Sequence, residues 1–269
     1  MVDDVKYFNG LTTVNVELTN RCNKDCWMCG RRKVDRDYPE IALNYGDMDF
    51  ELAKSIAGQL PNDIVVQLHN NGDPLLYPRF AEASSLFHRQ IRCLDTNGKL
   101  LVKRANEIIE NFDTLTISTF EKDVDSEEQF HLIEEFLKIK GSKKPNVIIR
   151  CLGDVDVSRY EKFGCIIARR ILHSPMGSYS YTKNPTIPEI GICLEALNHM
   201  VIRRDGKVSV CVRFDPEGTG IIGNCIKTPL VDIWNGAMRK GWVKCHKEGC
   251  RSKIQLCSKC EYWGVPTGW

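Results

Sequence analysis

The chain has 269 residues, 13 of them cysteine, with a hydrophobic fraction of 42% and a formal net charge of +2. A chain of this length can bury a full core without disulfide support, and its near-neutral charge gives no electrostatic basis for nucleic-acid binding. No apolar run approaches the roughly 20 residues of a membrane span, and the N-terminus lacks the apolar stretch of a signal peptide. We therefore expect a cytoplasmic protein without nucleic-acid or membrane partners, whose cysteines serve metal binding or catalysis.

Short β-rich runs alternate with amphipathic runs up to about residue 174. This pattern predicts strands at 12–18, 63–69, 91–96, 114–119, 146–151 and 166–173, and helices at 49–60, 78–89, 99–111, 126–139 and 158–163. The helix at 126–139 begins with Ser126 and Gln129, which resemble a capping box. Six strands alternating with five helices favour an α/β fold, a partial (β/α)6 barrel with right-handed crossovers. Functional residues of such barrels gather at the C-terminal ends of the strands.

The character of the sequence changes after this region. We predict three parts: a barrel at 1–174, a linker or covering loop at 175–192 that is rich in proline and turn residues, and a small cysteine-rich domain at 193–269. Within the last part, residues 204–207 (RDGK) predict a hairpin turn, and residues 230–239 predict a short helix.

Three cysteines crowd into the predicted loop after the first strand. Cys22, Cys26 and Cys29 have the spacing C-x3-C-x2-C. Three thiolates cannot complete a tetrahedral zinc site alone, but they can hold three irons of a [4Fe-4S] cluster and leave the fourth iron open. A zinc site completed by a distant residue is the alternative.

This loop resembles the cluster motif of the radical S-adenosylmethionine (SAM) superfamily, and further family features follow in order. Met28 stands where the family usually has an aromatic residue beside the adenine. Gly72 and Asp73 lie in a segment that resembles the one holding the SAM amino group, with Asp73 in the acidic position. Asn97 belongs to a third similar segment, and Ser118 matches a position that contacts the SAM ribose or carboxylate. The resemblance implies that these five residues bind SAM.

Polar residues at the ends of later strands are candidates for catalysis. Arg150 could pair with the SAM carboxylate or an anionic substrate, the alternative being a surface salt bridge, and His173 is a second candidate. Arg170 is a weaker one. Gln67 and His69 alternate with Leu68, which predicts that both face the barrel interior.

Four later cysteines form a second group. Cys193 and Cys211 flank the predicted hairpin with 17 residues between them, and Cys257 and Cys260 follow near the end. This arrangement resembles the twitch form of the SPASM-like auxiliary-cluster domain. It implies one auxiliary [4Fe-4S] cluster held by all four, and a zinc site is the alternative.

The remaining six cysteines fall into two sets. Three lie in apolar surroundings and are predicted to be buried core residues: Cys93, Cys151 and Cys165. Three have no predicted role: Cys225, Cys245 and Cys250.

The resemblance implies an oxidoreductase that cleaves SAM reductively to a 5'-deoxyadenosyl radical and abstracts a hydrogen atom from a substrate. The spacing of the second group is similar to that of compact family members that oxidise small polar alcohols, such as a sugar or an aminocyclitol. An electron donor such as flavodoxin or ferredoxin is implied as well. An epimerase or a peptide-modifying enzyme, and a non-catalytic iron–sulfur or zinc protein, are the alternatives.

Overall fold

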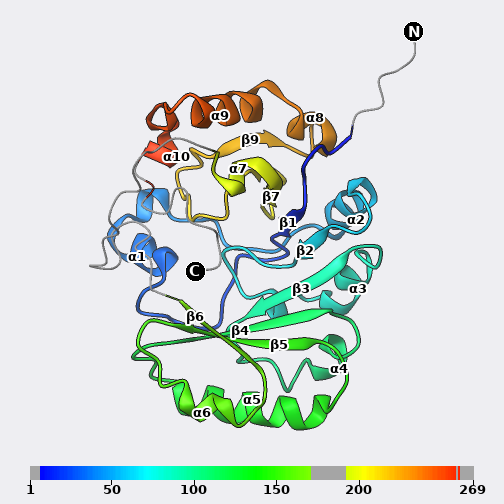
Figure 1. The fold of residues 1–269 in the computed structure, drawn as a ribbon, viewed down its shortest axis with the longest axis vertical. Coiled ribbons are helices and arrows are strands. Elements are labelled where there is room, and N and C mark those ends of the chain that lie inside the picture. The colour runs from blue at the N-terminus through cyan, green and yellow to red at the C-terminus, as the bar shows by residue number, and fades with distance from the viewer. Residues whose placement is uncertain (1–6, 171–191, 259, 261–269) are drawn as a thin grey trace.

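The computed structural model describes residues 7–170, 192–258 and 260. Within them, nine strands form one sheet in the order β6-β5-β4-β3-β2-β1-β7-β8-β9 (Figure 1). The strands are β1 (Thr13–Val16), β2 (Val65–Gln67), β3 (Ile91–Thr96), β4 (Thr114–Phe120), β5 (Asn146–Leu152), β6 (Ile166–Arg170), β7 (His199–Ile202), β8 (Lys207–Ser209) and β9 (Ile221–Asn224).

The helices surround this sheet. The α-helices are α1 (Gly30–Asp37), α2 (Phe50–Gln59), α3 (Phe80–Ser85), α4 (Ala105–Ile108), α5 (Ser126–Lys140), α6 (Ser158–Glu161), α7 (Leu194–Asn198), α8 (Leu230–Trp234), α9 (Ala237–Lys247) and α10 (Gln255–Ser258). Short 3-10 helices span Pro39–Ile41, Pro74–Leu76 and Arg251–Lys253.

The topology confirms the predicted α/β partial barrel. Strands β1 to β6 pair in parallel with their sequence neighbours. On the other side of β1, β7 is also parallel, and β8 and β9 then continue the sheet as antiparallel strands. The predicted cysteine-rich domain thus extends the barrel sheet from its first strand. The three-part division stays a prediction, and nearly all of the predicted linker lies outside the described residues.

Several predicted helices differ from those observed. The helix predicted at 99–111 is wrong in length, since only α4 is α-helical there and turns flank it. The helix predicted at 230–239 ends with α8, and a second, unpredicted helix α9 starts after Gly236. The chain turns there because Asn235 closes α8 with non-helical backbone angles. Beyond β6, the rest of the strand predicted at 166–173 lies outside the described residues.

The predicted capping box of α5 is also wrong. The N-cap residue is Asp125, and no side chain caps the helix. The Gln129 side chain instead donates hydrogen bonds to the backbone carbonyls of Asn97 and Ser118, at 2.5 and 2.9 Å. A residue expected to stabilise its own helix therefore joins two strand ends.

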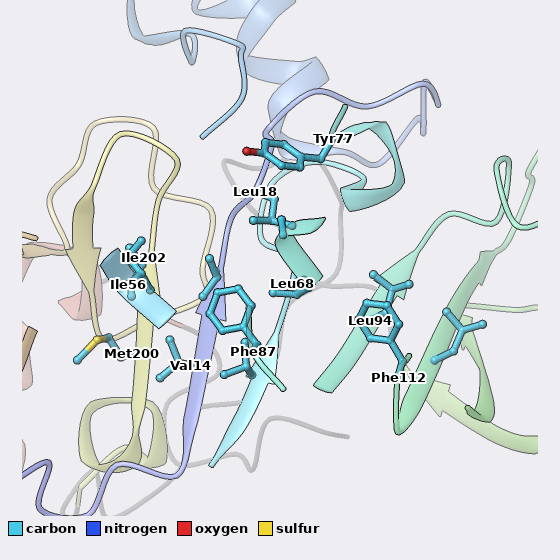
Figure 2. Close-up of a cluster of buried hydrophobic side chains, with 14 of the residues drawn as sticks. Val14, Leu18, Ile56, Leu68, Tyr77, Phe87, Leu94, Phe112, Met200 and Ile202 are labelled. Atoms are coloured by element: carbon cyan, nitrogen blue, oxygen red, sulfur yellow. The ribbon is translucent and has the colours of Figure 1, made fainter. Parts of the chain in front are cut away.

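Alternation along the strands separates an apolar face from a polar one. Val14, Leu68 and Leu94 are fully buried and pack with helix residues such as Ile56 and with Phe87, as Figure 2 shows. Each such side chain stabilises the fold by roughly 1.5–3 kcal/mol on burial. Because side chains of a strand alternate between faces, the residues between these apolar positions point into the barrel.

Candidate active site

The three-cysteine loop connects β1 to α1. Cys29 is the N-cap residue of α1, and its N–H donates to the Cys26 carbonyl at 2.9 Å, which folds the loop back on itself. Burial raises the pKa of Cys26 to about 12, and the neighbouring Cys29 and Cys22 add to the shift. Hydrogen-bond donors face the other two sulfurs: Arg31 bonds to Cys29, and the Asn97 amide lies 3.5 Å from the Cys22 Sγ. Thiols gathered with such donors fit an iron–sulfur cluster.

A buried ion pair connects this loop to the segment that follows β4. Lys24 Nζ lies 2.5 Å from Asp123 Oδ2, and the two side chains are only 1% and 3% exposed. The Lys24 ammonium also lies 4.7 Å from the centre of the Phe120 ring. Nearby, the Trp27 indole N–H donates to the Glu121 carbonyl at 2.9 Å. These contacts hold the loop over the carboxyl ends of the strands, where the fold predicts the chemistry.

The segment after β2 lies tightly against this loop. A Cβ on Gly72 would lie 2.5 Å from the carbonyl oxygens of Arg21 and Thr19, so only glycine fits. The Asp73 N–H also donates to the Arg21 carbonyl at 2.8 Å. Gly72 therefore allows the two predicted SAM-binding segments to meet at backbone contact.

Asp73 connects this segment to the end of β3. Its carboxylate accepts hydrogen bonds from the Leu75 N–H at 3.0 Å, the Thr96 hydroxyl at 2.8 Å and the Asn97 N–H at 2.8 Å. Burial nevertheless raises its pKa. Asn97 then reaches both Cys22 and Asn23 through its side-chain amide. With 2% of Asp73 exposed, this geometry favours a positioning role for that residue.

The other predicted cofactor residues lie around the same loop. Met28 lies within the three-cysteine loop and is buried, with 6% exposed. Ser118 is half-buried. The Gln129 side-chain amide donates hydrogen bonds both to the Ser118 carbonyl and to the Asn97 carbonyl. No sequence pattern pointed to Gln129 in this role.

An interior cluster of charged residues lies deeper in the barrel. Arg150 Nη1 contacts Asp95 Oδ2 at 2.5 Å, and His69 Nε2 lies 3.4 Å from the same oxygen. Burial lowers the pKa of His69. At Asp95, burial alone would raise the pKa of the carboxyl, but the interactions with His69 and Arg150 outweigh it, so that pKa is lowered. The half-buried Arg170 has a lowered pKa, mainly because of burial and secondly because of the positive charge of Arg150. Arg150 thus forms a mostly buried ion pair rather than a surface salt bridge. Asp95 is a further site residue, to which no sequence motif pointed.

The interior polar contacts continue across β1 to β7. Asn15 donates to the His69 carbonyl at 2.9 Å, and its side-chain oxygen lies 2.7 Å from His199 Nε2. His199 Nδ1 pairs with Glu195 at 2.8 Å. The alternation that predicts His69 and Gln67 as interior residues is confirmed, since the intervening Leu68 lies in the core. The same alternation could have found Asn15 and Asp95. His173 lies outside the described residues.

The four cysteines of the second group line one small cavity. Its volume is about 30 Å³. The lining residues are Cys193, Glu195, Ala196, Val210, Cys211, Arg213, Trp242, His246, Leu256, Cys257 and Cys260. The expected approach of Cys193 and Cys211 across the β7–β8 hairpin is confirmed.

Local backbone geometry explains this convergence. Cys193 is the N-cap residue of α7, and the N–H groups of Glu195 and Ala196 face its sulfur. The pKa of Cys257 is raised to about 12, mainly by burial and then by the neighbouring thiols of Cys260 and Cys193. Burial raises the pKa of Cys193, and the N–H groups of Glu195 and Ala196 oppose that shift because helix N-terminal N–H groups favour a thiolate. Four thiols converging on one cavity have the donor chemistry that an iron–sulfur cluster requires.

The other cysteines are distributed between core and surface. Cys151 is buried, as predicted, but Cys93 and Cys165 are only half-buried, so the prediction of burial was wrong for those two. Cys93 lies on β3, and Cys165 lies directly before β6. Cys225 is buried in the core, where burial raises the pKa of its thiol to about 11.

The last two unassigned cysteines contact each other. Cys245 and Cys250 share a side-chain hydrogen bond, and the Cys250 N–H donates to the Cys245 carbonyl at 2.8 Å. Across the described ranges, no three His, Cys, Asp or Glu side chains are arranged to hold a single metal ion. The helices in the same ranges include none with the length and apolarity of a membrane span.

Comparisons with known proteins agree with this architecture. The sequence model of the SPASM family, an iron–sulfur cluster-binding domain, matches residues 193–261. A S-adenosyl-L-methionine-dependent 2-deoxy-scyllo-inosamine dehydrogenase from Niallia circulans is 24% identical over 263 residues, covering 94% of each chain.

Solved structures give the same result for the fold. The crystal structure of BtrN in complex with AdoMet and 2-DOIA has a TM-score of 0.65, with 20% identity and 96% of each chain covered. The structure of anSMEcpe with bound AdoMet has a TM-score of 0.63 and 13% identity, covering 94% of this chain and 84% of the other. These comparisons agree with the predicted resemblance: the chain shares the fold of these AdoMet-bound proteins, and its residues 193–261 match the SPASM iron–sulfur cluster-binding domain.

Proposed function

We propose that the protein is a radical SAM dehydrogenase that oxidises a small polar alcohol of the aminocyclitol or sugar class. The observation that carries the proposal is the presence of two separate cysteine sites, one of three thiols and one of four. The chain that holds them matches a SAM-dependent dehydrogenase along 94% of both lengths. The epimerase, peptide-modifying and non-catalytic alternatives have no comparable support.

The first site would hold a [4Fe-4S] cluster and SAM. Cys22, Cys26 and Cys29 would ligate three irons, and the cluster with SAM would supply the 5'-deoxyadenosyl radical. Asn97 and Arg31 would donate hydrogen bonds to the ligating sulfurs.

The predicted SAM contacts would come from the adjacent segments. Met28 would pack beside the adenine and Ser118 would face the ribose or carboxylate. Gly72 would bring the segment after β2 against the cysteine loop, and Asp73 would hold Asn97 in place through its N–H.

The interior cluster would bind the substrate. Arg150 and Asp95 offer a donor and an acceptor, which together suit a molecule carrying hydroxyl and amino groups. Burial keeps His69 more readily neutral, so it could accept a proton from a substrate hydroxyl. His173 remains a predicted catalytic residue.

The second site would hold the auxiliary [4Fe-4S] cluster. Cys193, Cys211, Cys257 and Cys260 would be its ligands, and the cluster would take the second electron of the oxidation. We also propose a flavodoxin or ferredoxin as electron donor and the cytoplasm as location, where a reducing environment would keep the free cysteines reduced.

Anaerobic reconstitution tests the proposal. The protein is loaded with iron and sulfide, reduced with dithionite and given SAM with 2-deoxy-scyllo-inosamine or a panel of related cyclitols. We expect 5'-deoxyadenosine together with a product lacking two hydrogen atoms, and neither in the Cys26→Ser control. A wild-type protein that forms no 5'-deoxyadenosine would refute the enzyme assignment.

A further inference from the structure

The charge of the chain is concentrated in its C-terminal part. Residues 237–260 contain seven basic residues and one acidic one, a formal charge of +6 in a chain of net charge +2. The basic residues are Arg239, Lys240, Lys244, Lys247, Arg251, Lys253 and Lys259. The rest of the chain is therefore negative on balance, and this segment should attract a partner of opposite charge.

Three of these lysines form a stripe along α9. Lys240, Lys244 and Lys247 are exposed and follow the helical spacing that places them on one face. Lys244 has a weak contact with Glu248 at 3.8 Å. Among the described residues, Lys240 and Lys247 form no ion pair, so most of the charge of the stripe is free to act on a partner.

The stripe borders a surface cavity with an apolar margin. The cavity has a volume of about 460 Å³ and lies between α9 and the end of α7. Leu197 lines it and is 38% exposed, while Leu194 and Met238 nearby are 47% and 56% exposed. An apolar patch beside charged residues is the usual composition of a protein-docking surface.

The opposite face of α9 lines the auxiliary cavity. Trp242 and His246 are buried there beside the four cysteines. Helix α7 also borders both cavities. Its N-cap residue Cys193 lines the auxiliary cavity, and Leu197 near its other end lines the surface cavity. A helix is about 10 Å across, so a partner seated on the stripe would be separated from the cluster cavity by little more than one helix. Figure 1 shows α9 at the outer edge of the molecule.

We propose that this surface, the basic face of α9 with Leu194, Leu197 and Met238, docks an acidic one-electron carrier protein. The inference rests on the proposed function, since the substrate radical would give one proton to solvent and one electron to the auxiliary cluster in each turnover. An oxidised carrier bound at α9 takes that electron and is itself reduced by one electron. A nucleic acid would also be attracted by the charge, but it would have no use for the adjacent cluster.

Charge reversal tests the docking surface. The variant Lys240→Glu/Lys244→Glu/Lys247→Glu is compared with a control that reverses three exposed barrel lysines, Lys54, Lys103 and Lys143. Binding of an acidic flavodoxin to the cluster-loaded proteins is measured by calorimetry at several salt concentrations. Electron transfer from the reduced auxiliary cluster to oxidised flavodoxin is followed by stopped flow.

We expect the α9 variant to weaken binding and slow the second-order transfer at least about tenfold at low salt, and to reduce the salt dependence of both. The barrel control should change both by less than about twofold. Equal effects in the two variants, or binding of a single-stranded oligonucleotide in place of flavodoxin, would overturn the proposal. Formation of 5'-deoxyadenosine with dithionite is measured in parallel, because its absence in the wild type would refute the proposed function instead.

Discussion

The sharpest prediction concerns Gly72, which lies where the cysteine loop meets the segment after β2. An alanine Cβ at this position would lie 2.5 Å from two carbonyl oxygens, and ordinary contact needs about 3.4 Å. The two backbones would therefore have to separate by about 0.9 Å. Both oxygens belong to main chain, so no side chain can rotate away to relieve the contact. The hydrogen bond from the Asp73 N–H to Arg21, now 2.8 Å, would lengthen or break.

We expect Gly72→Ala to cost about 1–3 kcal/mol of unfolding free energy by overpacking. Formation of 5'-deoxyadenosine should fall by about tenfold to a hundredfold, because a displacement near 1 Å misplaces the reacting groups. Iron content, urea unfolding and 5'-deoxyadenosine are measured beside Gly58→Ala. That control lies inside α2 with no atom within 4 Å of the added carbon, and it should stabilise the protein slightly. Equal stability and activity of the two variants would refute the steric argument.

Three further predictions test the interior cluster and the unassigned cysteines. Arg150→Met should lower the free energy of unfolding by about 2–3 kcal/mol, because the mostly buried Asp95 carboxylate loses its guanidinium partner. Urea titrations measure this loss, and a value below about 0.5 kcal/mol would contradict the reasoning. Because the pKa of Asp95 lies below its ordinary value of 3.8, its stabilising effect is full above that pH and is lost as the pH falls further. The stability difference between the wild type and Asp95→Asn should therefore shrink in urea titrations below pH 3.8, and a constant difference would argue against it. The double variant Cys245→Ser/Cys250→Ser should keep about eight irons per chain in a colorimetric assay, whereas Cys211→Ser should retain about four. Loss of iron from the double variant would instead assign Cys245 and Cys250 to a cluster.

The strand pattern and cysteine spacing predicted much of the architecture, because both are local properties of the sequence. Strand alternation correctly placed His69 inside the barrel, and the hairpin between β7 and β8 correctly brought Cys193 towards Cys211. Asp95 lies on the same interior face. No role was predicted for it, because the function of a charged side chain within a strand depends on its neighbours on adjacent strands, which the sequence does not show.

Helix ends and long-range contacts were harder to predict for physical reasons. The break between α8 and α9 depends on a local backbone turn at Asn235. Gln129 matched a capping pattern but bonds to strand ends more than ten residues away, since tertiary contacts outweigh a local preference. The ion pair of Lys24 with Asp123 joins residues 99 positions apart, and no sequence spacing encodes that contact.

Strands β1 and β7 are paired neighbours, and each is directly connected in sequence to one of the two cysteine groups. The first loop leaves the carboxyl end of β1, while β7, which directly follows the helix that Cys193 starts, pairs with β1 along its whole length. Asn15 on β1 also bonds to His199 on β7, so backbone pairing and side-chain contact act together. Two groups of ligands more than 160 residues apart in sequence are thus connected through two adjacent strands. If the second site takes an electron from the substrate, as proposed above, this pairing would hold the strands that carry the two cysteine groups in a fixed register.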